Sequence, residues 1–127
     1  MSAPAVEPVV RQLSQEMLDR YAAASGDHNP IHTDEAFAKT TPMGGTIAHG
    51  MLVLSTISSM MTVAFGQRWL NNGTLDVRFR APARPGDTII ARARPAAGAP
   101  EGRHRYAVEC ANQKDEVLIT GTAEVGL

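Results

Sequence analysis

Polar and apolar residues alternate in four segments of the second half of the chain. In residues 74–81, the apolar residues Leu75, Val77 and Phe79 alternate with charged ones. The same alternation recurs in residues 88–94, 105–110 and 117–125. A period of two is typical of a strand that buries one face, and turn-forming residues separate the four segments. The pattern therefore predicts four successive strands joined as an antiparallel meander.

The segment from Gly50 to Phe65 predicts a helix without a polar face. Only serine and threonine hydroxyls interrupt its apolar residues, and these can bond back to carbonyls of the same helix. At 1.5 Å per residue the helix is roughly 22 Å long. It is shorter than the stretch of about 20 apolar residues that a membrane span requires. A helix of this kind must be surrounded, so we expect the rest of the domain to wrap it and no membrane insertion.

The first half of the chain adds a short strand and a capped helix. Residues 9–13 fit the strand, Ser14 fits the N-cap of the helix, and Gly26 fits its left-handed end. Together, the pattern predicts an α+β fold in which a curved antiparallel sheet of about five strands wraps a long central helix. Residues 1–127 are expected to form one such domain.

A second short helix is predicted after the turn at Asn29-Pro30. The residue before a proline avoids the helical conformation, so Asn29 should lie in the turn. Thr33 is predicted to cap the helix, and Asp34 and Glu35 are predicted to lie in its first turn as partners of the helix dipole. His32 should then lie just before this helix.

The composition describes a domain with little net charge. The 127 residues include 12 basic and 13 acidic side chains, for a formal charge of -1. A near-neutral chain with 5% aromatic residues lacks the field and the stacking surfaces that favour nucleic acid as a partner. The single cysteine, Cys110, can form neither an internal disulfide nor a zinc-binding thiolate cluster. Residues 1–10 carry no secretory signal, so the expected location is the cytoplasm.

The densest group of polar residues lies between Ser25 and His32. Asp27 and His32 are five positions apart and can turn toward one point. A carboxylate and an imidazole form an acid/base pair whose pKa values the surroundings can separate. The same loop also suits a structural role, because Asp27 can close an Asx turn and Asn29 can form the turn before a proline. Residue types and spacing leave both interpretations open.

A second candidate is the pair His49-Gly50 at the start of the long helix. A helix N-terminus offers unpaired N–H groups with a partial positive charge, and Gly50 lacks a Cβ that would keep a ligand oxygen away. Such donors can form an oxyanion hole. The alternative is that His49 only caps the helix and that Gly50 only relieves crowding.

Two sequence motifs resemble those of a known enzyme family. Residues 21–34 read YAAASGDHNPIHTD, and residues 44–51 read GGTIAHGM. These runs are similar to the motif of MaoC-like hydratases, the (R)-specific enoyl-CoA hydratases of the hotdog fold. The resemblance covers essentially the whole domain, because a long buried helix followed by four strands also suits that fold.

The resemblance implies the hydration of a trans-2-enoyl thioester to a (3R)-3-hydroxyacyl thioester, and the reverse dehydration. It assigns a water molecule to Asp27 and His32, and the thioester oxygen to the backbone N–H of Gly50. It also implies that Asn29 fixes the loop, that His49 orients the start of the helix, and that Ser58 lines the site. For Ser58, a hydroxyl bonded back to its own helix is an equal alternative. The resemblance implies neither a metal ion nor a cofactor beyond the coenzyme A or acyl carrier protein of the substrate.

The resemblance also implies a homodimer, or a dimer of dimers, with sites at the interface. A single layer of this fold leaves one sheet edge and one helix flank open. Two other functions of the same fold compete with hydration. A thioesterase would direct water at the thioester carbonyl rather than at C3, and a binding module would hold the acyl thioester without reaction.

Overall fold

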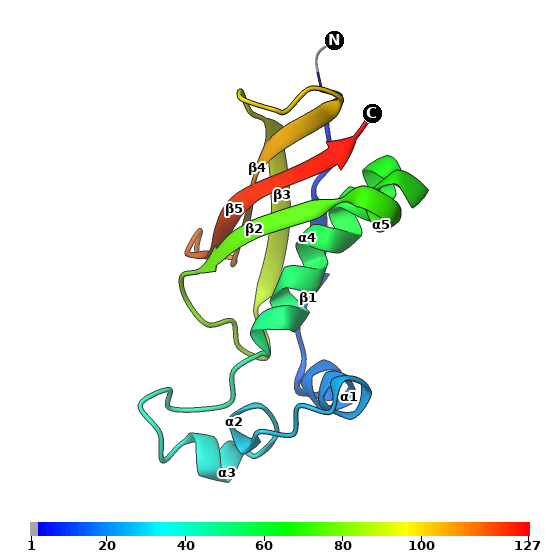
Figure 1. The fold of residues 1–127 in the computed structure, drawn as a ribbon. Helices are drawn as coiled ribbons and strands as arrows, with labels where there is room; N and C mark the ends of the chain where they lie inside the picture. Colours follow the sequence, from blue (N-terminus) through cyan, green and yellow to red (C-terminus); the bar gives the residue numbers. More distant parts are fainter. Residues whose placement is uncertain (1–2) are drawn as a thin grey trace.

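The computed structural model describes residues 3–127 and shows an α+β fold (Figure 1). The elements are β1 (Val9–Gln12), α1 (Gln15–Ser25), α2 (Pro30–Thr33), α3 (Glu35–Ala38), α4 (Gly50–Phe65), α5 (Gln67–Asn72), β2 (Thr74–Phe79), β3 (Thr88–Pro95), β4 (Arg103–Ala111) and β5 (Val117–Gly126). All strand pairs are antiparallel, and α4 lies across one face of the sheet. Helices α1, α2 and α3 lie beyond the N-terminal end of α4 (Figure 1). The predicted five-stranded sheet with a long central helix is confirmed.

The order of the strands differs from the predicted meander. The sheet has the order β1-β3-β4-β5-β2, so β3, β4 and β5 form a meander but β2 pairs with β5. The link between β2 and β3 contains a turn at Pro85-Gly86, and backbone hydrogen bonds of Leu13 hold that turn. The Leu13 amide donates to the Asp87 carbonyl at 2.8 Å, and the Leu13 carbonyl accepts from the Gly86 amide at 2.9 Å. The meander was wrong for β2 because a period of two identifies a strand but not its neighbour.

The core lies between α4 and the inner face of the sheet. Its largest fully buried side chains include Leu13, Leu18, Ile57, Met60, Met61, Ile89, Tyr106, Leu118, Ile119 and Val125. The other flank of α4 is open, because Met51 is 58% exposed and Val63 is 75% exposed. The prediction that this chain alone surrounds the helix is therefore wrong: one sheet covers only one side. In residues 3–127, every helix is too short or too polar to cross a membrane.

The signals at both ends of α1 are confirmed. The Met17 amide donates to the Ser14 side chain at 3.2 Å, which is the bond expected of an N-cap. Gly26 ends the helix in the left-handed conformation with a φ of 81°. A residue with a Cβ would be strained there, so glycine is the residue that lets the chain leave α1 at this angle.

The second short helix is in fact two separate turns, α2 and α3. Pro30 begins α2, because proline suits the first turn of a helix, and α2 ends at Thr33. Asp34, not Thr33, caps α3, since its Oδ1 accepts from the Phe37 amide at 3.1 Å. The predicted cap was therefore wrong by one residue, and His32 lies inside α2 rather than before a helix.

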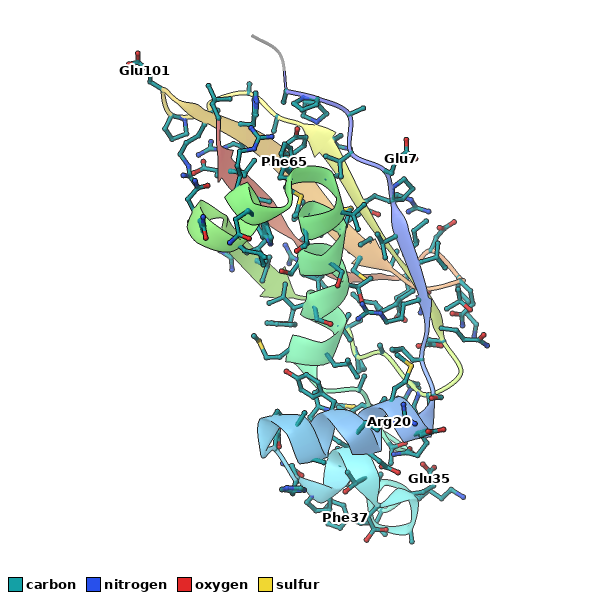
Figure 2. All side chains as sticks on the ribbon, turned by 90° about the vertical axis from the view of Figure 1, so that its right-hand side faces the viewer. Glu7, Arg20, Glu35, Phe37, Phe65 and Glu101 are labelled. Carbon is teal, nitrogen blue, oxygen red and sulfur yellow. The ribbon has the colours of Figure 1, made fainter. Side chains whose placement is uncertain are left out.

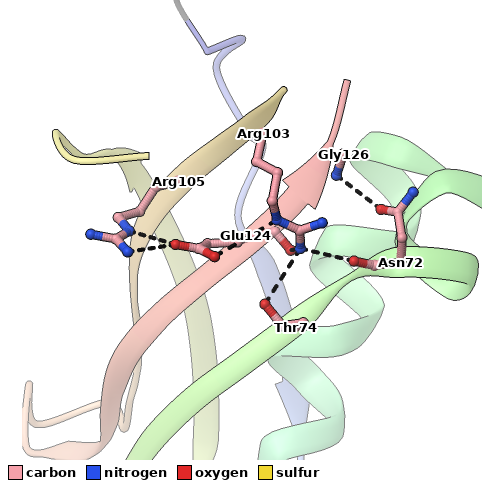
Figure 3. Close-up of polar contacts among 6 residues, drawn as sticks. All are labelled: Asn72, Thr74, Arg103, Arg105, Glu124 and Gly126. Atoms are coloured by element: carbon pink, nitrogen blue, oxygen red, sulfur yellow. Dashed lines mark hydrogen bonds and ion pairs between the residues drawn. The ribbon is translucent and has the colours of Figure 1, made fainter. Parts of the chain in front are cut away.

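Helix α5 was not predicted, and polar contacts fix it to the sheet (Figure 3). Asn72 Oδ1 accepts from the Gly126 amide at 2.9 Å, and Arg103 Nη2 donates to the Asn72 carbonyl at 2.9 Å. Glu124 binds Arg105 on the same surface, with Arg105 Nε at 2.7 Å. Six residues are too few to show a helical periodicity, so the sequence pattern does not predict this helix.

Candidate active site

The loop after α1 is shaped by the polar side chains that it contains. The Asp27 amide donates to Ser25 Oγ at 3.2 Å, and Asp27 Oδ1 accepts from the Asn29 amide at 3.2 Å. Asn29 Oδ1 accepts from the Ile31 amide at 3.1 Å and so caps α2. Asp27 and Asn29 therefore do have the structural role of turn-forming residues in this loop. It occupies one carboxylate oxygen of Asp27 and leaves Oδ2 available.

The free oxygen of Asp27 faces the imidazole of His32. Asp27 Oδ2 and His32 Nε2 are 3.7 Å apart, and the His32 side chain is 12% exposed. His32 Nδ1 lies 2.8 Å from the Ile47 carbonyl. A carbonyl only accepts, so Nδ1 carries the proton and Nε2 is the nitrogen that can gain or lose one. The structure thus brings Asp27 and His32 together with their free atoms facing.

His49 packs against both of these residues. Its ring stacks on His32 with the ring centroids 3.8 Å apart, and Tyr21 meets it edge-on at 4.8 Å. His49 Nε2 donates to the Asp27 carbonyl at 3.1 Å. Burial lowers the pKa of His49 and outweighs the raising effect of this hydrogen bond; the nearby His32 lowers it further. His49 is therefore a neutral side chain that supports the pair.

Asp27, His32 and His49 also have the chemical types of metal ligands, and their ligand atoms lie within 4.8 Å of one another. A metal ion lies close to the plane of each imidazole that binds it. The rings of His32 and His49 are stacked with only 24° between their planes, so one ion cannot meet this condition for both. Nε2 of His49 is bonded to Asp27, and Nδ1 is buried. This arrangement does not fit a metal centre.

Gly50 begins α4 at the wall of a hollow of about 300 Å³. The residues around the hollow are Tyr21, Ser25, Asp27, His49, Gly50, Met51 and Phe79. No side chain caps this end of α4, and within residues 3–127 the amides of Gly50 and Met51 have no hydrogen-bond partner. A Cβ on Gly50 would lie 3.0 Å from Cε1 of Phe79, so packing also requires glycine here. Both interpretations of Gly50, donor and relief of crowding, are compatible with this geometry.

Ser58 lies two turns further along α4 and does not line this hollow. Its hydroxyl accepts from Trp69 Nε1 at 3.0 Å, which links α4 to α5. Trp69 is 6% exposed, so this hydrogen bond satisfies a buried indole N–H. Within one protomer, the geometry gives Ser58 a structural contact rather than a place beside Asp27 and His32.

Sequence reasoning missed Phe79 and Ile47 as parts of the site. Phe79 continues the alternation of β2 and was expected to be buried, but it is 55% exposed and packs over Gly50. Ile47 contributes only its backbone carbonyl, and a backbone contact leaves no mark in the residue type. The sequence carries no signal for either contact.

Comparisons with known proteins agree with this architecture. The family described as "MaoC like domain" matches residues 3–116. A 3-hydroxybutyryl-CoA dehydratase from Methylorubrum extorquens is 36% identical, over 94% of this chain and 76% of that protein. An (R)-specific enoyl-CoA hydratase from Rhodospirillum rubrum is 31% identical, over 92% of this chain and 81% of that protein. The solved structure of the unliganded R-hydratase PhaJ1 from Pseudomonas aeruginosa has a TM-score of 0.83 at 28% identity, over 98% of this chain and 81% of that one.

Proposed function

The chain belongs to the MaoC-like domain family, and on that premise we propose that it hydrates trans-2-enoyl thioesters to (3R)-3-hydroxyacyl thioesters and catalyses the reverse dehydration. The observation that carries the proposal is the pair of Asp27 Oδ2 and His32 Nε2, 3.7 Å apart beside the open end of α4. This pair and the α4 amides supply acid/base groups and hydrogen-bond donors within one site.

In the proposed mechanism, one water molecule lies between Asp27 and His32. Asp27 Oδ2 takes a proton from this water, because Oδ1 is held in the turn with Asn29. Nε2 of His32 accepts a hydrogen bond from the second proton and so holds the water. The water oxygen forms the bond to C3, and the pair returns the first proton to C2 on the same face. Water has then been added across the double bond, and the carboxylate is regenerated.

Gly50 is proposed to stabilise the charge that develops during this step. As the bond to C3 forms, electron density moves toward the thioester oxygen. The Gly50 amide lines the hollow, is unpartnered within residues 3–127, and lies at the positive end of a helix of 16 residues. One such donor in an oxyanion hole contributes about 3 to 4 kcal/mol.

His49 and Asn29 are proposed to position the reacting groups rather than to react. His49 stacks on His32 and holds the backbone of Asp27, and Asn29 fixes the turn that directs Asp27. For Ser58 we propose a place in the site of a neighbouring protomer, because it lies on the open flank of α4 and outside the hollow of its own chain.

We propose that the chain works as a homodimer joined along β2. Among residues 3–127 this strand pairs only with β5, so its other edge is free in that part of the chain. Four apolar side chains on β2, α4 and α5 are each at least 55% exposed: Phe79 on β2, Met51 and Val63 on α4, and Leu70 on α5. Light scattering during size-exclusion chromatography should give twice the mass of the chain. Four times that mass indicates a dimer of dimers, and the mass of a single chain contradicts the proposal.

We propose that coenzyme A or an acyl carrier protein carries the acyl group. We also propose that the protein is located in the cytoplasm. A chain with one cysteine has no internal disulfide, which suits a reducing compartment. That cysteine, Cys110, is buried, and burial raises the pKa of its thiol to about 12. Rates measured with the same acyl group on both carriers would identify the one that is used.

The decisive experiment is to mix the protein with crotonyl-CoA. Hydration should remove the absorbance of the conjugated enoyl group without releasing free thiol, and chiral chromatography of the product should give the (3R) isomer. Thiol release would instead identify a thioesterase. Binding without either change would identify a binding module, and both of these outcomes contradict the proposed function.

A further inference from the structure

A network of polar side chains lies beside a second hollow, of about 490 Å³, next to the loop of residues 43–49. Thr46 is its centre and is 2% exposed. The Thr46 amide donates to Glu35 Oε2 at 3.1 Å. The Thr46 hydroxyl lies 2.7 Å from Gln15 Oε1 and 3.0 Å from Glu35 Oε2, so its single proton is shared between two acceptors. We call Gln15, Glu35 and Thr46 the Thr46 network.

The Thr46 network reaches His32 from two sides. Gln15 Nε2 donates to the His32 carbonyl at 2.8 Å. The residue after Thr46 is Ile47, whose carbonyl accepts from His32 Nδ1 at 2.8 Å and whose amide donates to the Ile31 carbonyl at 3.1 Å. Two groups next to the Ile47 carbonyl are thus fixed: Thr46 precedes Ile47 and is held by Gln15 and Glu35, and the Ala48 amide, in the same peptide as the carbonyl, donates to the Ala83 carbonyl at 2.8 Å.

Glu35 lies in the first turn of α3, as predicted, but it does not cap that helix. Asp34 is the cap, and the Glu35 carboxylate binds Thr46. The hydrogen bonds that Glu35 accepts from the Thr46 amide and hydroxyl lower the pKa of Glu35, and the positive charges of Lys39 and Arg84 lower it further. The carboxylate therefore remains an acceptor at neutral pH. A Cβ on Gly45 would lie 3.0 Å from Glu35 Oε1, which gives a packing reason for glycine at that position.

We propose that Thr46 is a positioning residue, which fixes the tautomer of His32 through the Ile47 carbonyl, with Gln15 and Glu35 as its supports. When the Ile47 carbonyl is held against Nδ1, the proton resides on Nδ1, and Nε2 keeps its lone pair toward Asp27. When Thr46 is released, the carbonyl can move and the proton can shift to Nε2, which removes the acceptor that the water needs. The catalytic consequence rests on the proposed function, but the tautomer does not.

The first test measures the tautomer without any substrate. The ¹⁵N chemical shifts of the His32 ring, recorded at about pH 8, where histidines are neutral, distinguish a protonated Nδ1 from a protonated Nε2. The wild-type protein should show the proton on Nδ1. Thr46→Val should show a mixture, and Thr46→Ser, which keeps the hydroxyl, should restore the wild-type pattern. An unchanged Nδ1–H pattern in Thr46→Val overturns the proposal.

The second test measures turnover of crotonyl-CoA by the same variants. Thr46→Val should lower kcat about tenfold with KM changed less than about twofold, because the positioned proton transfer is affected and binding is not. Thr46→Ser should recover most of the rate. Thr40→Val is the matched control, since the exposed Thr40 hydroxyl donates to the Phe37 carbonyl of its own turn, and it should leave kcat unchanged. A wild-type kcat in Thr46→Val, or a loss in the control as large as that in Thr46→Val, contradicts the proposal.

Glu35 provides an independent route if Thr46→Val fails to fold. Glu35→Gln keeps an acceptor oxygen, so it should retain the wild-type kcat and the Nδ1–H tautomer of His32. Glu35→Ala should lower kcat and show a mixture of tautomers. Glu16→Ala, which removes an exposed glutamate from the first turn of α1, should change neither. If Glu35→Ala matches the wild type in both measurements, the proposal is wrong. A wild-type protein with the Nδ1–H tautomer but without hydratase activity would contradict only the proposed function.

Discussion

The two ends of α4 are built in opposite ways. At the N-terminal end, no side chain caps the helix, the amides of Gly50 and Met51 are unpartnered within residues 3–127, and a hollow adjoins them. At the C-terminal end, the Gly66 amide donates to the Thr62 carbonyl at 2.7 Å, and α5 continues directly from Gly66. Figure 2 shows Phe65 at this closed end, far from Glu35 and Phe37 at the other.

On the proposed function, this difference separates catalysis at one end of the helix from stability at the other. Unpaired amides at a helix N-terminus cost stability but offer a positive site for a developing negative charge. At the other end, side-chain hydrogen bonds tie α5 to its neighbours: Trp69 bonds Ser58 of α4, and Asn72 bonds Gly126 of β5 (Figure 3). Changes at the open end should therefore affect turnover, and changes at the closed end should affect the free energy of unfolding.

The largest effect is expected at the acid/base pair. Asp27→Asn removes the base and His32→Ala removes the group that holds the water, so each should lower kcat for crotonyl-CoA hydration by about a hundredfold or more. The fold should persist, which circular dichroism can verify. His28→Ala is the control, because His28 is an exposed neighbour in the same loop. Near-normal turnover in either variant would contradict the assignment of that residue.

The oxyanion donor is tested by comparing Gly50→Pro with Gly50→Ala. Both variants place a Cβ against Phe79, but only proline removes the N–H. Proline is tolerated at the first position of a helix, and His49 with a ψ of 134° suits the residue before proline. The proline variant should be slower than the alanine variant by about 10²- to 10³-fold in kcat. Equal rates in the two variants would show that the amide is not the donor.

At the closed end, Asn72→Ala should lower the free energy of unfolding by about 1 kcal/mol, because the Gly126 amide loses its partner. Denaturant unfolding measures this change, and kcat should equal that of the wild type. Asn71→Ala is the control, since the Asn71 side chain bonds only the exposed Gln67 of its own helix. A loss of turnover without a loss of stability would reverse the comparison between the two ends.

The smallest effect is expected from His49 as the pH is lowered. Burial lowers the pKa of His49 below its usual value of 6.5, so the unfolded chain binds a proton before the folded protein does. The stabilisation is complete above about pH 6.5 and is lost as the pH falls toward the folded pKa. Glu35, whose pKa is also lowered, adds a loss only below its usual 4.5. Between these values, denaturant unfolding of His49→Gln should depend less on pH than unfolding of the wild type; equal slopes would contradict the burial argument.

Local signals were sufficient for much of the fold. Ser14 and Gly26 were identified because a capping bond and a left-handed end involve residues within one turn. The cap of α3 was wrong by one residue because Thr33 and Asp34 are both suitable caps, and only the observed bond to Phe37 distinguishes them. The pairing of β2 with β5 was missed because it joins segments about 45 residues apart.

For the site, the sequence identified Asp27, His32, His49 and Gly50 through motif and residue chemistry. It did not show that His49 stacks on His32, or that Phe79 lies over Gly50, because those contacts join segments distant in the chain. The sequence pattern placed Glu35 in the first turn of a helix, as a partner of the helix dipole. It did not predict the hydrogen bond with Thr46, because the two residues are 11 positions apart and meet only in the folded chain.

Residue patterns predicted the strands, α1 and α4, and the side chains that can exchange protons or accept charge. These properties depend on each residue and its near neighbours. The order of the strands, helix α5, the open end of α4 and the direction of the free atoms of Asp27 and His32 became visible only in the folded chain. Those features depend on hydrogen bonds and packing between distant segments, which exist only when the whole chain has folded.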